Sequence, residues 1–210
     1  MMYEKVPHEL LFTFEIDCFR GPFNKNPCTQ WQLSSFEKKT KADNSARVYM
    51  AWDMQGLSFR FQVPYEEAFH CAYPNIQEGD SVELFIDTRN VKTSRSTHRF
   101  FHHFYFLPER IEGMQCGEIT KFRSLDTHPL AQQKELGLDV ITQNHEYVMD
   151  IHIPSHCLHG YHPEVGEQLG LCYRINRYQK RAYSWPFSAE QVSLCYQPHL
   201  FPTITLQEAL

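Results

Sequence analysis

This 210-residue sequence lacks any apolar run that approaches the roughly 20 residues needed to span a membrane. We also expect no secretory signal at the N-terminus, because Glu4, Pro7 and Glu9 interrupt the short apolar run near the start. The net charge is −5, so the chain has no basic field of the kind that nucleic acids and anionic membranes attract. We therefore expect a cytoplasmic protein with neither a nucleic-acid nor a membrane partner.

Paired cysteines are missing as well. No two cysteines form a CxxC pair, which argues against a zinc knuckle. An odd number at wide spacing is typical of a reducing compartment, where cysteine serves as a small core residue. We predict free thiols and no structural disulfide for all seven: Cys18, Cys28, Cys71, Cys116, Cys157, Cys172 and Cys195.

Helical signals are few. The pattern predicts one short helix at 129–136 and a single turn at 155–158 that ends at Gly160. Segments 21–27 and 34–45 have the composition of irregular loops. Because no repeat or linker divides the chain, we expect one domain over residues 1–210.

Period-two alternation, by contrast, recurs along the whole chain. With 42% hydrophobic and 14% aromatic residues, the chain can bury a sizeable core. Many short strands separated by turn residues indicate an all-β fold: a two-sheet antiparallel β-sandwich, jelly-roll or immunoglobulin-like, with short helical turns. The predicted strands are 10–16, 48–52, 57–63, 81–87, 100–107, 138–142, 147–153, 169–176 and 203–206.

The most informative segment is GDSVELFIDTRN, followed after a polar turn by HRFFHHFYFLPE. In its first strand Glu83 and Asp87 share a face, opposite an apolar row. The second strand brings His102 and His103 into the neighbourhood. Acid, histidine and aromatic groups on one sheet face are typical of a small polar-ligand site. A merely solvated outer face is the alternative, since antiparallel sheets carry polar residues on their wet side.

Catalytic motifs are absent. The sequence has no GxSxG elbow, P-loop, GxGxxG or HExxH motif. Glu83 and Asp87 would lie about 13 Å apart along an extended strand, which exceeds the carboxylate separations of glycosidases. We therefore expect a non-catalytic protein without a cofactor.

A histidine-rich stretch supports one competing hypothesis. Imidazoles at short spacing can bind zinc, which would favour a metal-dependent enzyme. Here, however, the series spans a strand end and a loop interrupted by Pro154 and Gly160, so we predict no metal site. The histidines concerned are His152, His156, His159 and His162.

Four motifs in order carry a family resemblance: VYMAWDMQGLSFRFQV, GDSVELFIDTR, EYVMDIHIP and GEQLGLCYRIN, with a late Trp185. Their succession over residues 47–185 resembles the family 9 carbohydrate-binding modules and the wider DOMON-like group of β-sandwiches. The resemblance implies a β-sandwich that binds a terminal sugar between two tryptophans, with a carboxylate, an asparagine and an arginine bonding the hydroxyls.

Carried onto this chain, the resemblance assigns Glu83 as the carboxylate and Asn176 as the asparagine. Arg99 is the candidate arginine, and His102 joins this hydrogen-bonding set. No tryptophan stands in the region of Gln77, where the family has its first stacking residue. The stacking candidates in this chain are Tyr73, Tyr178 and Trp185.

We therefore predict a binding module for a carbohydrate or other small polar ligand on a concave sheet face. The main alternative is a protein-interaction or self-assembly module with an aromatic surface, because 16 phenylalanines and 11 tyrosines are many for one core to hide.

Overall fold

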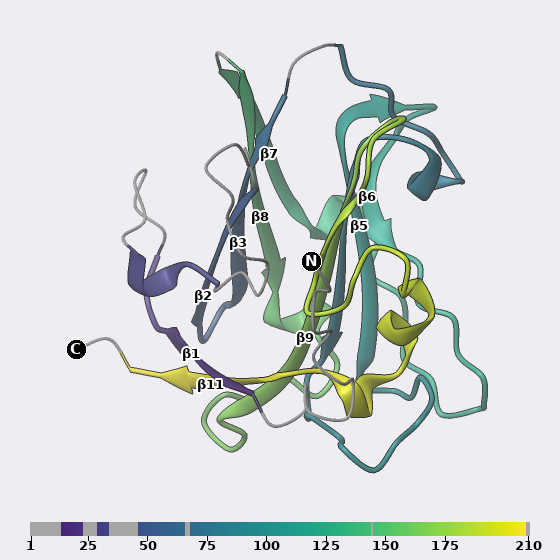
Figure 1. Cartoon of the computed structure of the whole chain (residues 1–210). Helices are drawn as coiled ribbons and strands as arrows, with labels where there is room; N and C mark the ends of the chain where they lie inside the picture. Colours follow the sequence, from purple (N-terminus) through teal and green to yellow (C-terminus); the bar gives the residue numbers. More distant parts are fainter. Residues whose placement is uncertain (1–13, 23–28, 34–45, 66–67, 144, 209–210) are drawn as a thin grey trace, which may run out of the picture.

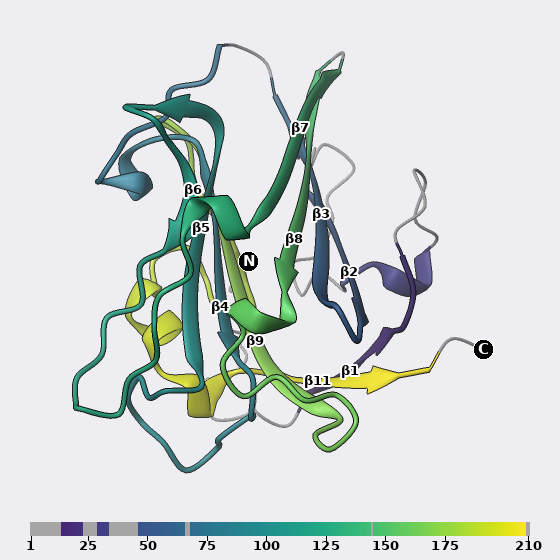
Figure 2. The same ribbon diagram turned by 180° about the vertical axis from the view of Figure 1, so that it is seen from behind.

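Two β-sheets face each other in this protein, as Figures 1 and 2 show from opposite sides. The structure is a computed structural model that describes residues 14–22, 29–33, 46–65, 68–143 and 145–208. Within these ranges every helix is a short 3-10 turn, so the predicted all-β sandwich is confirmed. The loop predicted at 34–45 and most of the one at 21–27 lie outside the described residues.

The larger sheet has seven strands in the order β1-β11-β9-β4-β5-β6, with β10 paired to β9. All its pairs are antiparallel except β1 with β11, which run parallel and so depart from the antiparallel prediction. The short strands β6 and β10 were not predicted. The strands are β1 (Glu15–Phe19), β4 (Ser81–Asp87), β5 (Phe101–Ile111), β6 (Met114–Glu118), β9 (Gln168–Asn176), β10 (Tyr183–Trp185) and β11 (Thr203–Gln207).

The smaller sheet has four strands in the order β2-β3-β8-β7, all antiparallel. A tight turn joins β2 to β3: Asp53 Oδ1 accepts the backbone N–H groups of Gln55 and Gly56, at 2.7 and 3.1 Å. Gly56 has a φ of +147°, a conformation that favours glycine. The strands are β2 (Arg47–Asp53), β3 (Gly56–Pro64), β7 (Gly137–Gln143) and β8 (Glu146–Pro154).

The main core lies between the sheets. Leu84 on β4 and Tyr173 on β9 form a cross-strand pair on the inner face, and both contribute to one continuous apolar cluster with Phe61 of the opposite sheet. Strict alternation explains the arrangement, because successive side chains of a strand point to opposite faces.

The 3-10 turns are η1 (Thr29–Trp31), η2 (Ile76–Glu78), η3 (Gln133–Glu135), η4 (Ser155–Cys157), η5 (Val192–Tyr196) and η6 (Pro198–Leu200). The helix predicted at 129–136 was wrong, since only the three residues of η3 are helical there. The turn predicted at 155–158 corresponds to η4, and Gly160 just beyond it has a φ of +84°. No helix in the described ranges is long and apolar enough to cross a membrane.

The outer face of the larger sheet is partly covered by the segment 186–202, which contains η5 and η6 (Figure 1). Its buried Phe187, Cys195 and Phe201 pack against Phe85 of β4 and Cys172 of β9. This second, smaller core covers the part of the outer face around Phe85 and Cys172.

Candidate functional site

Strand register brings Glu83 and Asn176 together on the outer face of the larger sheet. On β9, Asn176 pairs with Ser81 and Arg174 pairs with Glu83, while β5 places Tyr105 opposite Glu83 on the other side. The alternation predicted from the sequence therefore puts the carboxylate and the amide on the same face, as the resemblance implied.

The Glu83 carboxylate accepts three hydrogen bonds. Asn176 Nδ2 donates to Oε1 at 2.8 Å, and His103 Nε2 lies 2.9 Å from Oε2. The amide of Gln77 also donates to Oε2, at 3.2 Å. Arg174 Nε is 3.8 Å from Oε1, near enough to add a favourable charge. We call these five residues the Glu83 cluster.

Further contacts hold the donors of the cluster in place. Arg174 Nε donates to Asn176 Oδ1 at 2.6 Å, which turns the Asn176 amide nitrogen towards Glu83. The Asn176 amide nitrogen also donates to Ser81 Oγ at 2.9 Å. The His103 ring stacks on Phe85 with ring centroids 4.1 Å apart. The cluster is thus a preorganised set of polar groups rather than a loose surface patch.

Electrostatics keep this carboxylate ionised. Burial alone raises the pKa of Glu83, but the hydrogen bonds and charge of His103, with the amides of Asn176 and Gln77, more than offset that effect. The net result is a pKa of Glu83 below its ordinary value. An ionised, hydrogen-bonded carboxylate is a strong acceptor for hydroxyl groups.

Access to the carboxylate is closed in this structure. The Glu83 side chain has no solvent exposure, whereas Gln77, which bonds it, is an exposed residue of η2. On the other side Tyr196 of η5 meets the His103 ring edge-on, with centroids 5.5 Å apart. Removal of the Gln77 side chain is therefore the shortest route by which a ligand could reach Glu83.

Arg99 and His102 lie apart from the Glu83 cluster, although the sequence analysis grouped all of them. Arg99 precedes β5 and forms an exposed ion pair with Asp126. His102 pairs with Ile86 on the inner face, one residue out of phase with His103. The sequence could not distinguish the two adjacent histidines, because the register of β5 against β4 was unknown.

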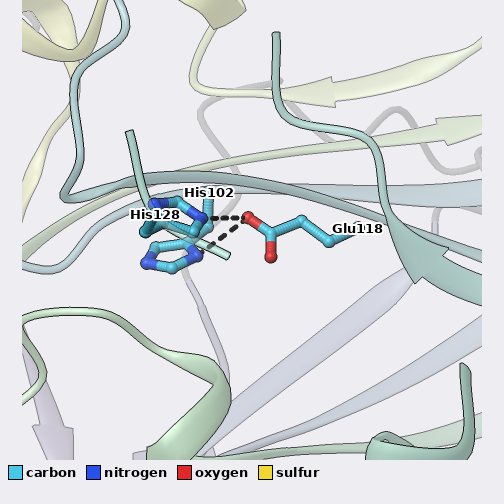
Figure 3. A group of neighbouring side chains, drawn as sticks. All are labelled: His102, Glu118 and His128. Atoms are coloured by element: carbon cyan, nitrogen blue, oxygen red, sulfur yellow. Dashed lines mark hydrogen bonds and ion pairs between the residues drawn. The ribbon is translucent and has the colours of Figure 1, made fainter. Parts of the chain in front are cut away.

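His102 belongs instead to a second polar group, shown in Figure 3. Its Nδ1 lies 3.0 Å from Glu118 Oε1, and His128 Nε2 lies 2.7 Å from the same oxygen. All three side chains are buried. No local sequence pattern indicated this group, because its members come from β5, the end of β6 and the following loop.

The predicted stacking residues have three different settings. Trp185 is buried and stacks on Tyr173 between the sheets, so it does not face the Glu83 cluster. Tyr73 is half-buried against Tyr105, whose strand position is opposite Glu83. Tyr178 is 39% exposed and stacks on His70 with centroids 4.4 Å apart.

Surface hollows of the described part of the chain include two near histidine residues. One lies at the end of the sandwich and is lined in part by His70, Asp80, Arg177 and Tyr178. The other lies beyond η4 and is lined in part by His156, Tyr161, His162 and Glu164. Neither hollow includes the Glu83 carboxylate.

The histidine series of the sequence analysis does not converge. His152 Nδ1 lies 3.1 Å from Ser58 Oγ, whereas His159 stacks on Phe100. His156 lies near Glu135 and Cys157. In the described part of the chain, no group of three potential metal ligands contains two histidines of this series.

Three members of the Glu83 cluster were not predicted as site residues: Gln77, His103 and Arg174. Arg174 could have been found, since it lies two residues before Asn176 and must share its face. His103 required the β4–β5 register, and Gln77 required the placement of η2.

This geometry defines a class: a β-sandwich with a preorganised acid–amide–histidine cluster on one face of a sheet. The model of the family described as carbohydrate family 9 binding domain-like matches residues 24–208. The chain belongs to this family and is a non-catalytic carbohydrate-binding module.

Solved structures agree with the fold. A family 9 carbohydrate-binding module from Caldicellulosiruptor kristjanssonii in complex with cellotriose matches with a TM-score of 0.64 at 15% identity, covering 93% of this chain and 95% of that one. The same kind of module from this organism in complex with glucose gives 0.65 at 15% identity, covering 93% and 97%. No curated protein sequence matches this chain significantly.

Proposed function

We propose that this module binds a saccharide at the Glu83 cluster, with a sugar hydroxyl taking the place of the Gln77 amide on Glu83 Oε2. The observation that carries the proposal is the ionised Glu83 carboxylate, bonded by Asn176 and His103 and covered by one exposed side chain. A hydroxyl donates to a carboxylate with geometry close to that of an amide N–H, so the exchange keeps the oxygen satisfied.

The ligand class follows from the family and the chemistry of the cluster. The similar structures were solved with cellotriose and glucose, so β-linked glucose units are the first ligands to test. Both N–H groups of Asn176 already donate within the cluster, to Glu83 and Ser81, so the group that receives a sugar hydroxyl is the Glu83 carboxylate itself, beside the Arg174 guanidinium. Tyr73 reaches this part of the sheet through its contact with Tyr105, and it is the stacking candidate of this proposal.

Affinity should be low. No tryptophan stands near Gln77, and one lost aromatic platform costs about 0.5–1.5 kcal/mol beyond area burial, or up to roughly tenfold in affinity. Displacing the Gln77 amide costs further free energy. We expect dissociation constants in the high micromolar range or weaker.

The experiment is a titration of glucose and cellotriose into isotope-labelled protein, followed by NMR chemical shifts. We expect shifts of the backbone amides around Gln77, Glu83 and Asn176. Glu83→Gln should weaken binding about 5- to 150-fold, because the buried donors lose an ionic acceptor worth about 1–3 kcal/mol. Glu164→Gln, an exposed residue of the second hollow, is the matched control and should bind like the wild type.

Two results would contradict this proposal: an unperturbed Glu83 region at high sugar concentration, or equal binding by Glu83→Gln. Shifts confined to the hollow around Tyr178 would place the ligand there instead. The alternative of an aromatic docking surface has little support, because Tyr178 is the one exposed residue among the described phenylalanines, tyrosines and tryptophans.

A further inference from the structure

His102, Glu118 and His128 form a group on the inner face (Figure 3). It lies on the opposite face of β5 from His103 of the Glu83 cluster and has no part in the proposed function. His102 is fully buried on β5, Glu118 is the last residue of β6, and His128 lies in the loop that follows. One ligand atom from each residue lies within 4.8 Å of the other two.

The far nitrogen of each imidazole faces a backbone carbonyl. His128 Nδ1 lies 2.6 Å from the Arg99 oxygen, and His102 Nε2 lies 3.4 Å from the His159 oxygen. A carbonyl only accepts hydrogen bonds, so each of these nitrogens carries the hydrogen. In neutral imidazoles the lone pairs then lie on His102 Nδ1 and His128 Nε2, and both point at Glu118 Oε1.

Two lone pairs directed at a carboxylate oxygen repel it unless a positive charge lies between them. A proton can provide that charge, and so can a metal ion. An imidazole whose second N–H is bonded to a carbonyl is the usual arrangement around protein metal ions, because it fixes the tautomer and the ring.

The carboxylate is held in a matching way. Ala131 N donates to Glu118 Oε2 at 2.9 Å, and Thr120 Oγ1 donates to Oε1 at 2.6 Å. Ligating carboxylates typically have such outer hydrogen bonds. Bonds of about 2.0–2.1 Å in a tetrahedral zinc site put ligand atoms about 3.3 Å apart. The two nitrogens are 3.0 and 2.7 Å from Glu118 Oε1, within about 0.6 Å of that separation.

We propose that His102, Glu118 and His128 form a binding site for a divalent transition-metal ion, with Zn²⁺ as the first choice. Two imidazoles and one carboxylate suit Zn²⁺. They do not suit Ca²⁺ or Mg²⁺, because both of these ions prefer oxygen ligands only. The fourth position is left to a water molecule or to His159, whose ring stacks on His128 with centroids 5.8 Å apart.

The ion would have a structural role and not a catalytic one. The side chains of His102 and Glu118 have no exposure and that of His128 has 1%, so a substrate in solution would not reach an ion held between them. Binding would tie β5, β6 and the loop around His128 into one unit. Because the site exists only in the folded chain, bound metal adds directly to folding stability.

The chain offers a matched control. Glu135, His156 and Cys157 form a second group of potential ligands, but His156 is exposed and two of these residues are adjacent in η4. Replacing His156 removes a histidine of the same kind from a surface position and leaves the buried group intact.

The test is Zn²⁺ binding by the full chain after chelation and reloading, measured by elemental analysis, calorimetry and thermal unfolding. We expect about one zinc per chain and a raised Tm for the wild type and for His156→Ala. His128→Ala should bind at least about 100-fold more weakly and show no rise in Tm. Failure of the wild type to bind, or retention by His128→Ala, would overturn the proposal.

A ligand exchange keeps the test decisive if His128→Ala does not fold. The His128→Cys variant loaded with Co²⁺ should gain a thiolate-to-cobalt charge-transfer band that Co²⁺-loaded wild type lacks. A spectrum without that band would overturn the assignment. Loss of zinc binding in His156→Ala would assign the ion to the η4 group instead. The proposed sugar site lies on the other face of the larger sheet and is tested by NMR titration, so neither result depends on the Glu83 proposal.

Discussion

The Gln77 side chain lies over the Glu83 carboxylate, with Nε2 3.2 Å from Oε2, and it does so from an exposed turn. The other partners of Glu83 in the cluster are buried or half-buried on the sheet: Asn176, His103 and Arg174. Gln77 is therefore the one member of the cluster that can leave without disturbing a strand, and its removal should uncover the carboxylate.

Replacing Gln77 by alanine should strengthen saccharide binding. The wild-type amide competes for Oε2 with a hydrogen bond worth about 0.5–1.5 kcal/mol, so Gln77→Ala should bind cellotriose about 2- to 12-fold more tightly. NMR titration measures the change. Gln143→Ala, an exposed position on β7 of the other sheet, should leave affinity unchanged. Weaker binding by Gln77→Ala would show that Gln77 contacts the sugar rather than excluding it.

Stability should depend on pH through Glu83. Its pKa in the folded protein lies below the ordinary 4.5, because the donors around it outweigh its burial. The stabilisation is therefore complete above pH 4.5 and is lost as pH falls through the lower folded pKa. Urea unfolding should find Glu83→Gln less stable than wild type by about 1–3 kcal/mol at pH 7. This difference in stability between the two proteins should shrink towards pH 3, and a difference that stays constant with pH would contradict this account.

The β2–β3 turn should not tolerate a side chain at Gly56. A Cβ there would lie 2.1 Å from the Ile153 carbonyl oxygen, and the φ of +147° adds backbone strain. Gly56→Ala should lower the free energy of unfolding by about 3 kcal/mol or more. Gly113→Ala is the control: its φ is +83°, but nothing lies within 4 Å of the new Cβ. That change should cost about 1–2 kcal/mol, and equal losses in urea denaturation would refute the steric argument.

Thiol reactivity should be low in the native protein. Burial raises the pKa of Cys71, Cys116 and Cys157 to about 11. Since the thiolate is the reactive form, these residues should react with a disulfide reagent at pH 8 at least about 100-fold more slowly than a free thiol. In denaturant nearly all seven cysteines should react.

The same titration tests the redox prediction. The six described cysteines are free, although the sulfurs of Cys172 and Cys195 lie 3.3 Å apart beneath the segment 186–202. A bridge between these two in freshly purified protein would contradict the expectation of free thiols. It would also argue against a reducing cytoplasmic address, which stays a prediction.

Local pattern in the sequence was sufficient for the fold class and for two of the five residues of the Glu83 cluster. Alternation predicted β4 as 81–87, which is its observed extent, and it placed Glu83 opposite the apolar row of β4. It also placed Asn176 on the face of β9 that lies beside Glu83 of β4. These results need only a period of two, which each strand carries in its own residues.

Contacts between segments distant in the sequence were decided only by the tertiary structure. The β4–β5 register determined that His103, and not His102, bonds Glu83. The position of η2 put Gln77 over the carboxylate, and the loop after β6 brought His128 to Glu118. A one-residue shift in register exchanges the two faces of a strand, and the sequence of that strand does not encode its alignment with a partner. The sequence by itself therefore determined which residues can face a site, whereas packing decided which of them meet.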